Sequence, residues 1–189
     1  MNSSTIVFET HATSLDNEAR LASGWYDVDL SQPGRQQALD MRDRHRATAV
    51  RAVYCSDLRR SWRTADIAFA RRCPIIRDPR LRECDYGELT RARVEDIDRH
   101  RAEHVAVPFP GGESYEQVAA RVGDWLVDVL QTAGPEKLVV VGHRATYYAL
   151  EHLLRRRPLT EVVRAPWTWQ AGWIYEARTL DLPREEDHR

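Results

Sequence analysis

Short apolar runs, separated by polar and helix-forming segments, dominate the pattern of this chain. The runs at residues 5–11 and 137–143 each end on a histidine, His11 and His143, and the run at 50–55 leads directly toward Arg60. Continuous apolar runs of this length are typical of strands that are buried on both faces. Because the carboxyl ends of parallel strands meet at one edge of a sheet, we expect both histidines and the arginine to share a crevice there.

Helical spacing fills the intervals between these runs. Helices are expected at 36–45, 58–70, 114–133 and 147–154, the third of them opened by a capping box of Ser114 and Gln117. A short strand at 74–76 and a final antiparallel strand at 172–177 complete the pattern. The alternation predicts an α/β fold with a three-layer α/β/α architecture, in which a mostly parallel central sheet lies between two layers of helices.

One segment departs from this alternation. Residues 88–112 are polar and arginine-rich with few apolar anchors, and they close on a Pro-Phe-Pro-Gly-Gly sequence. We expect this excursion to form a lid over the crevice. With the lid included, residues 1–182 are predicted to form a single domain, and the charged residues 183–189 a disordered tail.

The balance of charges argues against nucleic acid or membrane partners. Dispersed among 29 acidic residues are 28 basic ones, so the formal net charge of −1 gives no global field that would hold a polyanion or an anionic membrane. No apolar run approaches the roughly 18 residues of a membrane span, and the polar start lacks a secretory core. We therefore expect a cytoplasmic protein, and a homodimer remains open.

The three cysteines, Cys55, Cys73 and Cys84, have no C-x-x-C spacing. Neither a disulfide framework nor a zinc site is indicated, so we expect reduced thiols and no metal or cofactor.

Two histidines and an arginine at one sheet edge suggest phosphate chemistry. A neutral imidazole can attack phosphorus while a second stabilises charge on the transferred oxygens, and these are the roles considered for His11 and His143. Arg60 would supply a planar, permanently charged fork for phosphate oxygens. Glu83 follows the third strand and precedes the lid, where a carboxyl group could protonate a departing alkoxide and later activate water.

Each of these residues also has an ordinary structural interpretation. A lone histidine at a strand end usually forms hydrogen bonds without a catalytic role. Arg60 could be a solvated residue of a basic helix, and Glu83 could pair with Arg80 or Arg82. The catalytic interpretation depends on these side chains coming together.

Six short motifs follow one another between about residue 6 and about residue 149. They are Thr10-His11-Ala12 followed by Asn17, Leu30-Ser31-Gln32-Pro33-Gly34-Arg35-Gln36-Gln37-Ala38, Ser56-Asp57-Leu58-Arg59-Arg60-Ser61-Trp62-Arg63-Thr64-Ala65, Leu81-Arg82-Glu83-Cys84-Asp85-Tyr86-Gly87, Gly112-Glu113-Ser114 and Val141-Gly142-His143. Any one of them is a weak signal, but in this order the chain resembles the histidine phosphatase superfamily, in its phosphoglycerate mutase-like branch.

The resemblance implies a phosphoglycerate mutase-like fold and a set of roles. His11 would be the phosphorylated nucleophile and Glu83 the proton donor. Arg60 and His143 would hold the phosphoryl oxygens, with Asn17 as a further phosphate contact. The partner would be a small phosphorylated substrate.

The match departs from the family at the nucleophile. The family has an arginine immediately before it and a glycine after it, where this chain has Thr10 and Ala12. Thr10 can donate a hydrogen bond but brings no charge, and losing one preorganised donor costs roughly 10²- to 10³-fold in rate. Arg144, where the family usually has a small residue, is the candidate to replace the missing cation.

Aromatic side chains near the site divide into two groups. Trp167, Trp169 and Trp173 are expected to pack in the core around the last strand. Trp25 and Tyr26 follow the nucleophile in a loop and are better placed to line a pocket.

Three functions remain to be distinguished. The first is a metal-independent phosphomonoesterase that acts through a phosphohistidine, with a modest lid that favours hydrolysis over a mutase reaction. The second uses the same pocket for non-phosphatase chemistry or for anion binding without turnover, although the joint presence of His11, Arg60, Glu83 and His143 argues against simple decay. The third, an interaction module, rests only on the arginine-rich surface.

Overall fold

The computed structural model describes residues 3–132, 134 and 136–178. One mixed sheet has the strand order β3-β2-β4-β1-β5, with β1 (Ser4–Thr10), β2 (Ala52–Cys55), β3 (Ile75–Arg77), β4 (Lys137–Gly142) and β5 (Trp173–Ala177). All pairings are parallel except that of β5 with β1. The predicted mostly parallel sheet is confirmed, and the tail at 183–189 lies outside the described residues.

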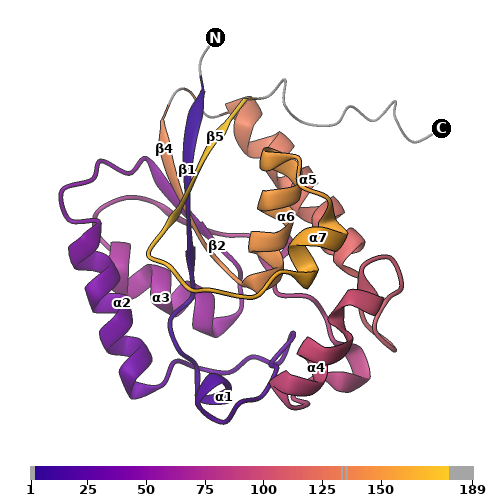
Figure 1. Ribbon diagram of the computed structural model, residues 1–189. Helices are drawn as coiled ribbons and strands as arrows, with labels where there is room; N and C mark the ends of the chain where they lie inside the picture. The colour runs from indigo at the N-terminus through magenta and orange to yellow at the C-terminus, as the bar shows by residue number, and fades with distance from the viewer. Residues whose placement is uncertain (1–2, 133, 135, 179–189) are drawn as a thin grey trace.

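Helices cover both faces of the sheet (Figure 1). On one face lie α2 (Gln32–Arg44) and α3 (Arg59–Phe69), and on the other lie α5 (Tyr115–Thr132), α6 (Arg144–Arg155) and α7 (Leu159–Arg164). Val7 and Val139 pack with Met41 of α2, whereas Phe8 and Val140 belong to the core formed with α5 and α6. Both faces of β1 and β4 are therefore shielded from solvent, which explains why these strands are continuous apolar runs.

Two helices begin earlier than the apolar spacing indicated. The expected helix at 36–45 starts at Gln32, because the Ser31 side chain accepts a hydrogen bond from the backbone N–H of Gly34 and Pro33 is tolerated in a first turn. The helix expected at 147–154 starts directly after His143. The short helix α7 was not anticipated.

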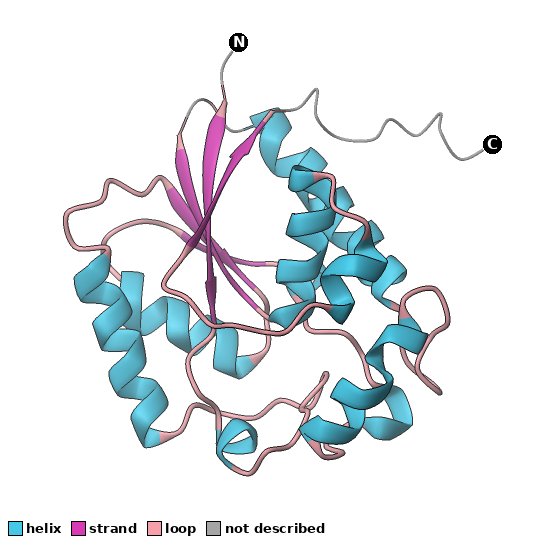
Figure 2. Ribbon diagram, in the orientation of Figure 1, coloured by secondary structure: helices cyan, strands magenta, loops and turns pink. Residues whose placement is uncertain are grey.

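The excursion at 88–112 is better anchored than its polar composition suggested. It contains α4 (Val94–His100) between 3₁₀ turns at Gly87–Leu89 and Arg101–His104. Its residues Ile97, Val105 and Phe109 are buried in the main core, so the expectation of few apolar anchors was wrong. Together with α1 (Leu15–Glu18), α4 lies beyond the carboxyl ends of the strands (Figures 1 and 2). Its movement as a lid stays a prediction.

The first turn of α2 closely approaches the loop that follows His11. The backbone N–H of Ser31 donates to the carbonyl oxygen of Thr13 at 3.0 Å, and the Ser31 hydroxyl donates to the same oxygen at 3.3 Å. A Cβ on Gly34 would lie 1.9 Å from that oxygen. Only glycine fits there, so α2 fixes the course of the chain beside His11.

The cysteines are free thiols, as the sequence predicted: Cys55 and Cys84 are buried and Cys73 is half-buried. Within the described ranges, no helix is long and apolar enough to cross a membrane. In the same part of the chain, no group of three or more His, Cys, Asp or Glu side chains is arranged to hold a metal ion.

Candidate active site

A cavity of about 550 Å³ opens at the carboxyl edge of the sheet. All seven residues singled out from the sequence line it: Thr10, His11, Asn17, Arg60, Glu83, His143 and Arg144. They come from the end of β1, from α1 and α3, from the segment after β3, and from the start of α6. The parallel topology has brought side chains from five parts of the chain to one cavity.

His11 and His143 lie side by side because β1 and β4 are neighbours in register. The backbone N–H of His11 donates to the carbonyl oxygen of Gly142 at 2.9 Å. The two imidazole centroids are 5.0 Å apart, with ring planes inclined by 57°. Nδ1 of His11 lies 2.8 Å from the carbonyl oxygen of Ala12. A carbonyl can only accept, so Nδ1 carries the proton and Nε2 of the neutral ring keeps the lone pair that a nucleophile needs.

His143 is fully buried and its ring has one hydrogen-bonded nitrogen. Nε2 lies 2.6 Å from the hydroxyl oxygen of Ser56, a residue that the sequence pattern placed in a motif but did not single out. Nδ1 is buried without a hydrogen-bond partner among the described residues. A buried polar atom of this kind is one that a ligand can satisfy.

Both imidazoles are held neutral by their surroundings. Desolvation, followed by the positive charge of Arg60, lowers the pKa of His11 from 6.5 to about 3. Desolvation also lowers the pKa of His143 well below 6.5, with Arg60 and His11 adding to the effect. At neutral pH the site therefore presents two uncharged imidazoles beside the guanidinium of Arg60.

Arg60 is held from two sides by backbone oxygens. Its side chain is almost entirely buried, and its Nη1 and Nη2 donate to the carbonyl oxygens of Tyr26 at 3.0 Å and Gly24 at 2.7 Å. Desolvation lowers the pKa of Arg60, but a guanidinium remains protonated in proteins. Carbonyl groups orient the fork without cancelling its charge, so that charge is available to an anion.

Glu83 is held at the beginning of α6. Its Oε1 accepts hydrogen bonds from the backbone N–H groups of Cys84 at 2.8 Å and Ala145 at 3.1 Å. The second donor belongs to the first turn of α6, where backbone N–H groups have no partner within the helix. Both bonds end on Oε1, so Oε2 carries neither of them.

The structural alternative for Glu83, an ion pair with Arg80 or Arg82, is not what the structure shows. Arg80 pairs with Asp78 at 2.8 Å, and Arg82 forms a two-pronged pair with Asp57 at 2.7 and 2.6 Å. The neighbouring arginines are thus occupied elsewhere, and the Glu83 side chain lines the cavity.

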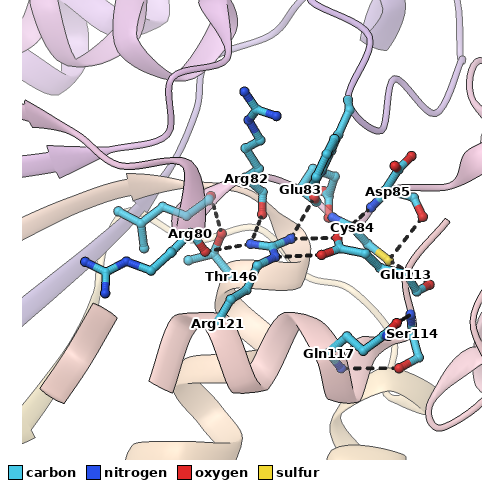
Figure 3. A network of polar contacts seen from close by, with 12 residues as sticks. Arg80, Arg82, Glu83, Cys84, Asp85, Glu113, Ser114, Gln117, Arg121 and Thr146 are labelled. Atoms are coloured by element: carbon cyan, nitrogen blue, oxygen red, sulfur yellow. Dashed lines mark hydrogen bonds and ion pairs between the residues drawn. The ribbon is translucent and has the colours of Figure 1, made fainter. Parts of the chain in front are cut away.

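Arg121 of α5 ties down the backbone that carries Glu83 (Figure 3). Its five N–H groups form five hydrogen bonds of 2.6 to 3.0 Å, to the carbonyl oxygens of Arg80, Arg82 and Glu83 and to both carboxylate oxygens of Glu113. The sequence pattern placed Glu113 in a motif without a role and did not single out Arg121. Helical spacing brings together side chains three or four positions apart, so the separation of eight positions gave no signal for this pair.

The cavity wall beside Thr10 is built differently. The Thr10 hydroxyl oxygen accepts a hydrogen bond from Nε1 of Trp169 at 3.2 Å. Arg144 lines the cavity, but its Nη1 donates to Asp98 of α4 at 2.8 Å and its guanidinium carbon lies 5.5 Å from the ring centroid of Trp167. Arg144 is therefore directed along the cavity wall toward α4, with a carboxylate already beside it.

Two other side chains that line the cavity are Asn17 and Glu9. Asn17 lines the cavity from α1, where its Oδ1 accepts a hydrogen bond from the Ser14 backbone N–H at 3.0 Å. Glu9 is buried and accepts a hydrogen bond from Arg44 at 3.2 Å, and it lies 2.8 Å from Nε2 of His45. Both side chains are thus held in place by neighbours.

The aromatic residues are distributed differently from the sequence prediction. Trp173 is buried in the core as expected, and Trp167 packs against that core and stacks on Trp173 while also lining the cavity. Trp169 lines the cavity and is 59% exposed, contrary to the expectation. Trp167 and Trp169 both lie in the loop that precedes β5, and the path of this loop brings them to the cavity. Trp25 donates from Nε1 to the carbonyl oxygen of Glu83 at 2.8 Å, and neither Trp25 nor Tyr26 lines the cavity.

Comparison with known proteins gives one consistent family. Residues 6–174 match the family model of the histidine phosphatase superfamily (branch 1). A probable phosphoglycerate mutase GpmB from Enterobacter sp. (strain 638) is 30% identical, with 88% of each chain covered. Phosphoserine phosphatase 1 from Hydrogenobacter thermophilus is 32% identical, over 77% of this chain and 75% of that protein.

Solved structures agree with the sequence relatives. A mycobacterial glucosyl-3-phosphoglycerate phosphatase in complex with VO3 superimposes with a TM-score of 0.74 at 26% identity, over 86% of both chains. Bacillus stearothermophilus YhfR gives a TM-score of 0.78 at 25% identity, over 90% of both chains. With its five-stranded phosphoglycerate mutase-like sheet, the chain belongs to the histidine phosphatase superfamily, branch 1.

Proposed function

We propose that this protein is a phosphomonoester hydrolase that passes the phosphoryl group of a small substrate first to His11 and then to water. The observation that carries the proposal is the pair of neutral imidazoles, His11 and His143, with centroids 5.0 Å apart in a cavity that also holds the buried guanidinium of Arg60. A neutral nucleophile beside a fixed cation suits attack on an anionic phosphate.

The proposed reaction has two steps. Nε2 of His11 forms a bond to phosphorus while the ester P–O bond breaks, and Glu83 gives its proton to the departing alcohol oxygen. Glu83 then takes a proton from water, whose oxygen attacks phosphorus and breaks the N–P bond. Inorganic phosphate leaves, and His11 and Glu83 return to their starting protonation states.

His143 and Arg60 are proposed to hold the phosphoryl oxygens. If the Ser56 hydroxyl donates to Nε2 of His143 across their 2.6 Å contact, the ring proton lies on Nδ1, the atom without a partner in the described chain. That N–H can then donate a hydrogen bond to a phosphoryl oxygen as negative charge develops there during transfer. Asn17 and Arg144 are proposed as further phosphate contacts at the cavity wall.

Hydrolysis is preferred to a mutase reaction because water has access to the site. Trp169 on the cavity wall is 59% exposed, and the Asp98 side chain on α4 is 41% exposed. A phosphohistidine in this cavity would be reachable from solvent. The alternative is non-phosphatase chemistry, or anion binding without turnover. The observation that favours it is Thr10, which stands where the family has an arginine.

The test is a rapid quench of the purified protein with ³²P-labelled substrate in EDTA. Wild type should hydrolyse p-nitrophenyl phosphate and carry an acid-labile, base-stable label on His11. His11→Ala should lose turnover by at least about 10³-fold, whereas His100→Ala, an exposed histidine of α4, should keep it. Normal turnover without any label would contradict the covalent mechanism, and anion binding without turnover would favour the alternative.

A further inference from the structure

The charges that line the cavity set a limit on the substrate. Among the described residues, the lining contains three guanidinium groups and four carboxylates: Arg44, Arg60 and Arg144, with Glu9, Asp40, Glu83 and Asp98. The single lysine of the chain, Lys137, begins β4 and so lies at the opposite end of that strand from His143. Since the two imidazoles are neutral, the positive charge for any additional anionic group of a substrate must come from one of the three arginines.

Two of these arginines already have carboxylate partners. Arg44 donates to the buried Glu9 at 3.2 Å. Arg144 donates to Oδ1 of Asp98 at 2.8 Å, and Arg101 donates to the same oxygen at 3.1 Å. In the described part of the chain, Arg60 is the one lining guanidinium without a carboxylate at ion-pair distance, because its Nη atoms meet backbone carbonyls.

We infer, on the basis of the proposed function, that the substrate is a monophosphate ester whose alcohol part carries neither a carboxylate nor a second phosphate. The phosphoryl group takes the charge of Arg60, and Arg144, as the proposed further phosphate contact, is then not available to a second anion. A second anionic group would then lie among Asp40, Asp98 and two cations that are already paired, and like charges brought together in a site disfavour binding.

The rest of the lining suits an alcohol without negative charge. Trp167 and Trp169 present aromatic rings, and Gln37 and Asp40 on α2 offer polar side chains at the same cavity. Aromatic ring faces can pack against the C–H groups of such an alcohol, and polar side chains can form hydrogen bonds with its hydroxyl groups. The preference differs from what the names of two relatives suggest, since phosphoglycerate and phosphoserine both carry a carboxylate.

Two matched pairs of esters test the inference. Glycerol 3-phosphate and 3-phosphoglycerate differ only in a hydroxymethyl group against a carboxylate, and phosphoethanolamine differs from phosphoserine only by lacking the carboxylate. We expect kcat/KM to favour the first member of each pair by at least about 10-fold, equivalent to about 1.4 kcal/mol. Equal values, or a preference for the carboxylated esters, would overturn the inference.

Asp98 provides a second measurement. In Asp98→Asn, Arg144 loses its carboxylate partner and one negative charge leaves the cavity, so discrimination against 3-phosphoglycerate should fall by about 3- to 10-fold. Asp128→Asn removes a comparable arginine-paired carboxylate outside the cavity and should leave the ratio unchanged. An unchanged ratio in Asp98→Asn would contradict the argument from charge.

The outcomes separate this inference from the proposed function. If p-nitrophenyl phosphate is hydrolysed but the esters are not discriminated, the substrate inference fails and the hydrolase proposal stands. If nothing is hydrolysed, the hydrolase proposal fails, and the same four esters are compared by calorimetric titration of the wild-type protein. Weaker binding of both carboxylated esters then supports the charge argument, and equal or tighter binding overturns it.

Discussion

On one side of the cavity, Arg121 fixes the segment that carries Glu83. Every N–H group of the Arg121 guanidinium donates a hydrogen bond. On the other side, the Thr10 hydroxyl meets the indole of a mostly exposed tryptophan, Trp169. A proton donor needs a fixed position relative to the bond that breaks, whereas a substrate-selecting wall can be open and mobile. The difference suggests that proton transfer belongs to the first wall and substrate binding to the second.

The sharpest test of the Glu83 wall is Glu83→Gln. Loss of a general acid should slow alkyl phosphates by roughly 10²- to 10⁴-fold. Aryl phosphates with good leaving groups need little proton donation and should be slowed much less. Steady-state kcat on both kinds of ester measures the difference, with Glu88→Gln on the neighbouring exposed turn as a control. An equal loss on both would point to a structural role.

The wall beside Thr10 is tested by Arg144→Ala. If Arg144 replaces the cation that Thr10 lacks, kcat/KM should fall by roughly 10²-fold, the size expected for one preorganised charged donor. Thr10→Arg should partly rescue that variant while changing the wild type little, because both residues would fill one role. Additive effects of the two substitutions, or Arg144 directed away from bound phosphate in a crystal structure, would remove the idea that it compensates.

Arg121→Lys should separate positioning from charge. Lysine keeps the charge but cannot reproduce a five-bond fork, so we expect a loss of about 1 to 2 kcal/mol in the free energy of unfolding. The variant should also lower kcat on alkyl phosphates more than on activated aryl phosphates, because Glu83 is less well placed. Arg51→Lys, at an exposed ion pair with Glu136, should do neither. A stability loss without the leaving-group effect would make Arg121 purely structural.

The smallest effect concerns pH. The pKa of His11 is about 3 in the folded protein and 6.5 in the unfolded chain. Between about pH 3 and pH 6.5 the unfolded state therefore binds a proton at this residue that the folded state does not bind. Stability should therefore fall as the pH drops below 6.5, and His143, whose pKa is also lowered, contributes in the same direction. Urea unfolding at pH 8 and pH 6 should show a loss smaller by about 1 kcal/mol in His11→Asn than in wild type. Equal losses would mean that His11 is not held neutral.

The sequence pattern was most informative where both faces of a strand are buried. The apolar runs ending at His11 and His143 located β1 and β4, and their common edge followed from parallel pairing. Helix starts were less well located, because Ser31 and Pro33 belong to a first turn that carries no apolar period. The spacing of apolar residues indicates which face of a helix is buried, but it gives no information about the N-cap.

The side-chain partners of the site were harder to anticipate. Arg144 was singled out, but its pairing with Asp98 depends on where α4 packs, which the polar sequence of that segment does not indicate. Arg121 was overlooked because an arginine on an amphipathic helix ordinarily belongs to the solvated face. Trp169 was assigned to the core, although the start of β5 was located to within one residue, because the path of the loop before that strand is set by packing. Each of these contacts depends on tertiary packing between segments that are distant along the chain.

The contact between Gly34 and the Thr13 carbonyl oxygen has a consequence for interpreting variants. Gly34 is 23 positions from His11 along the chain and touches no proposed substrate contact, yet a methyl group there would push directly on the loop beside the nucleophile. A genetic screen that scores only activity would register Gly34→Ala as a lesion of catalysis. Circular dichroism of that variant should retain the helical signal while phosphate binding weakens, so the damage would lie in the path of the backbone and not in a missing reactive group.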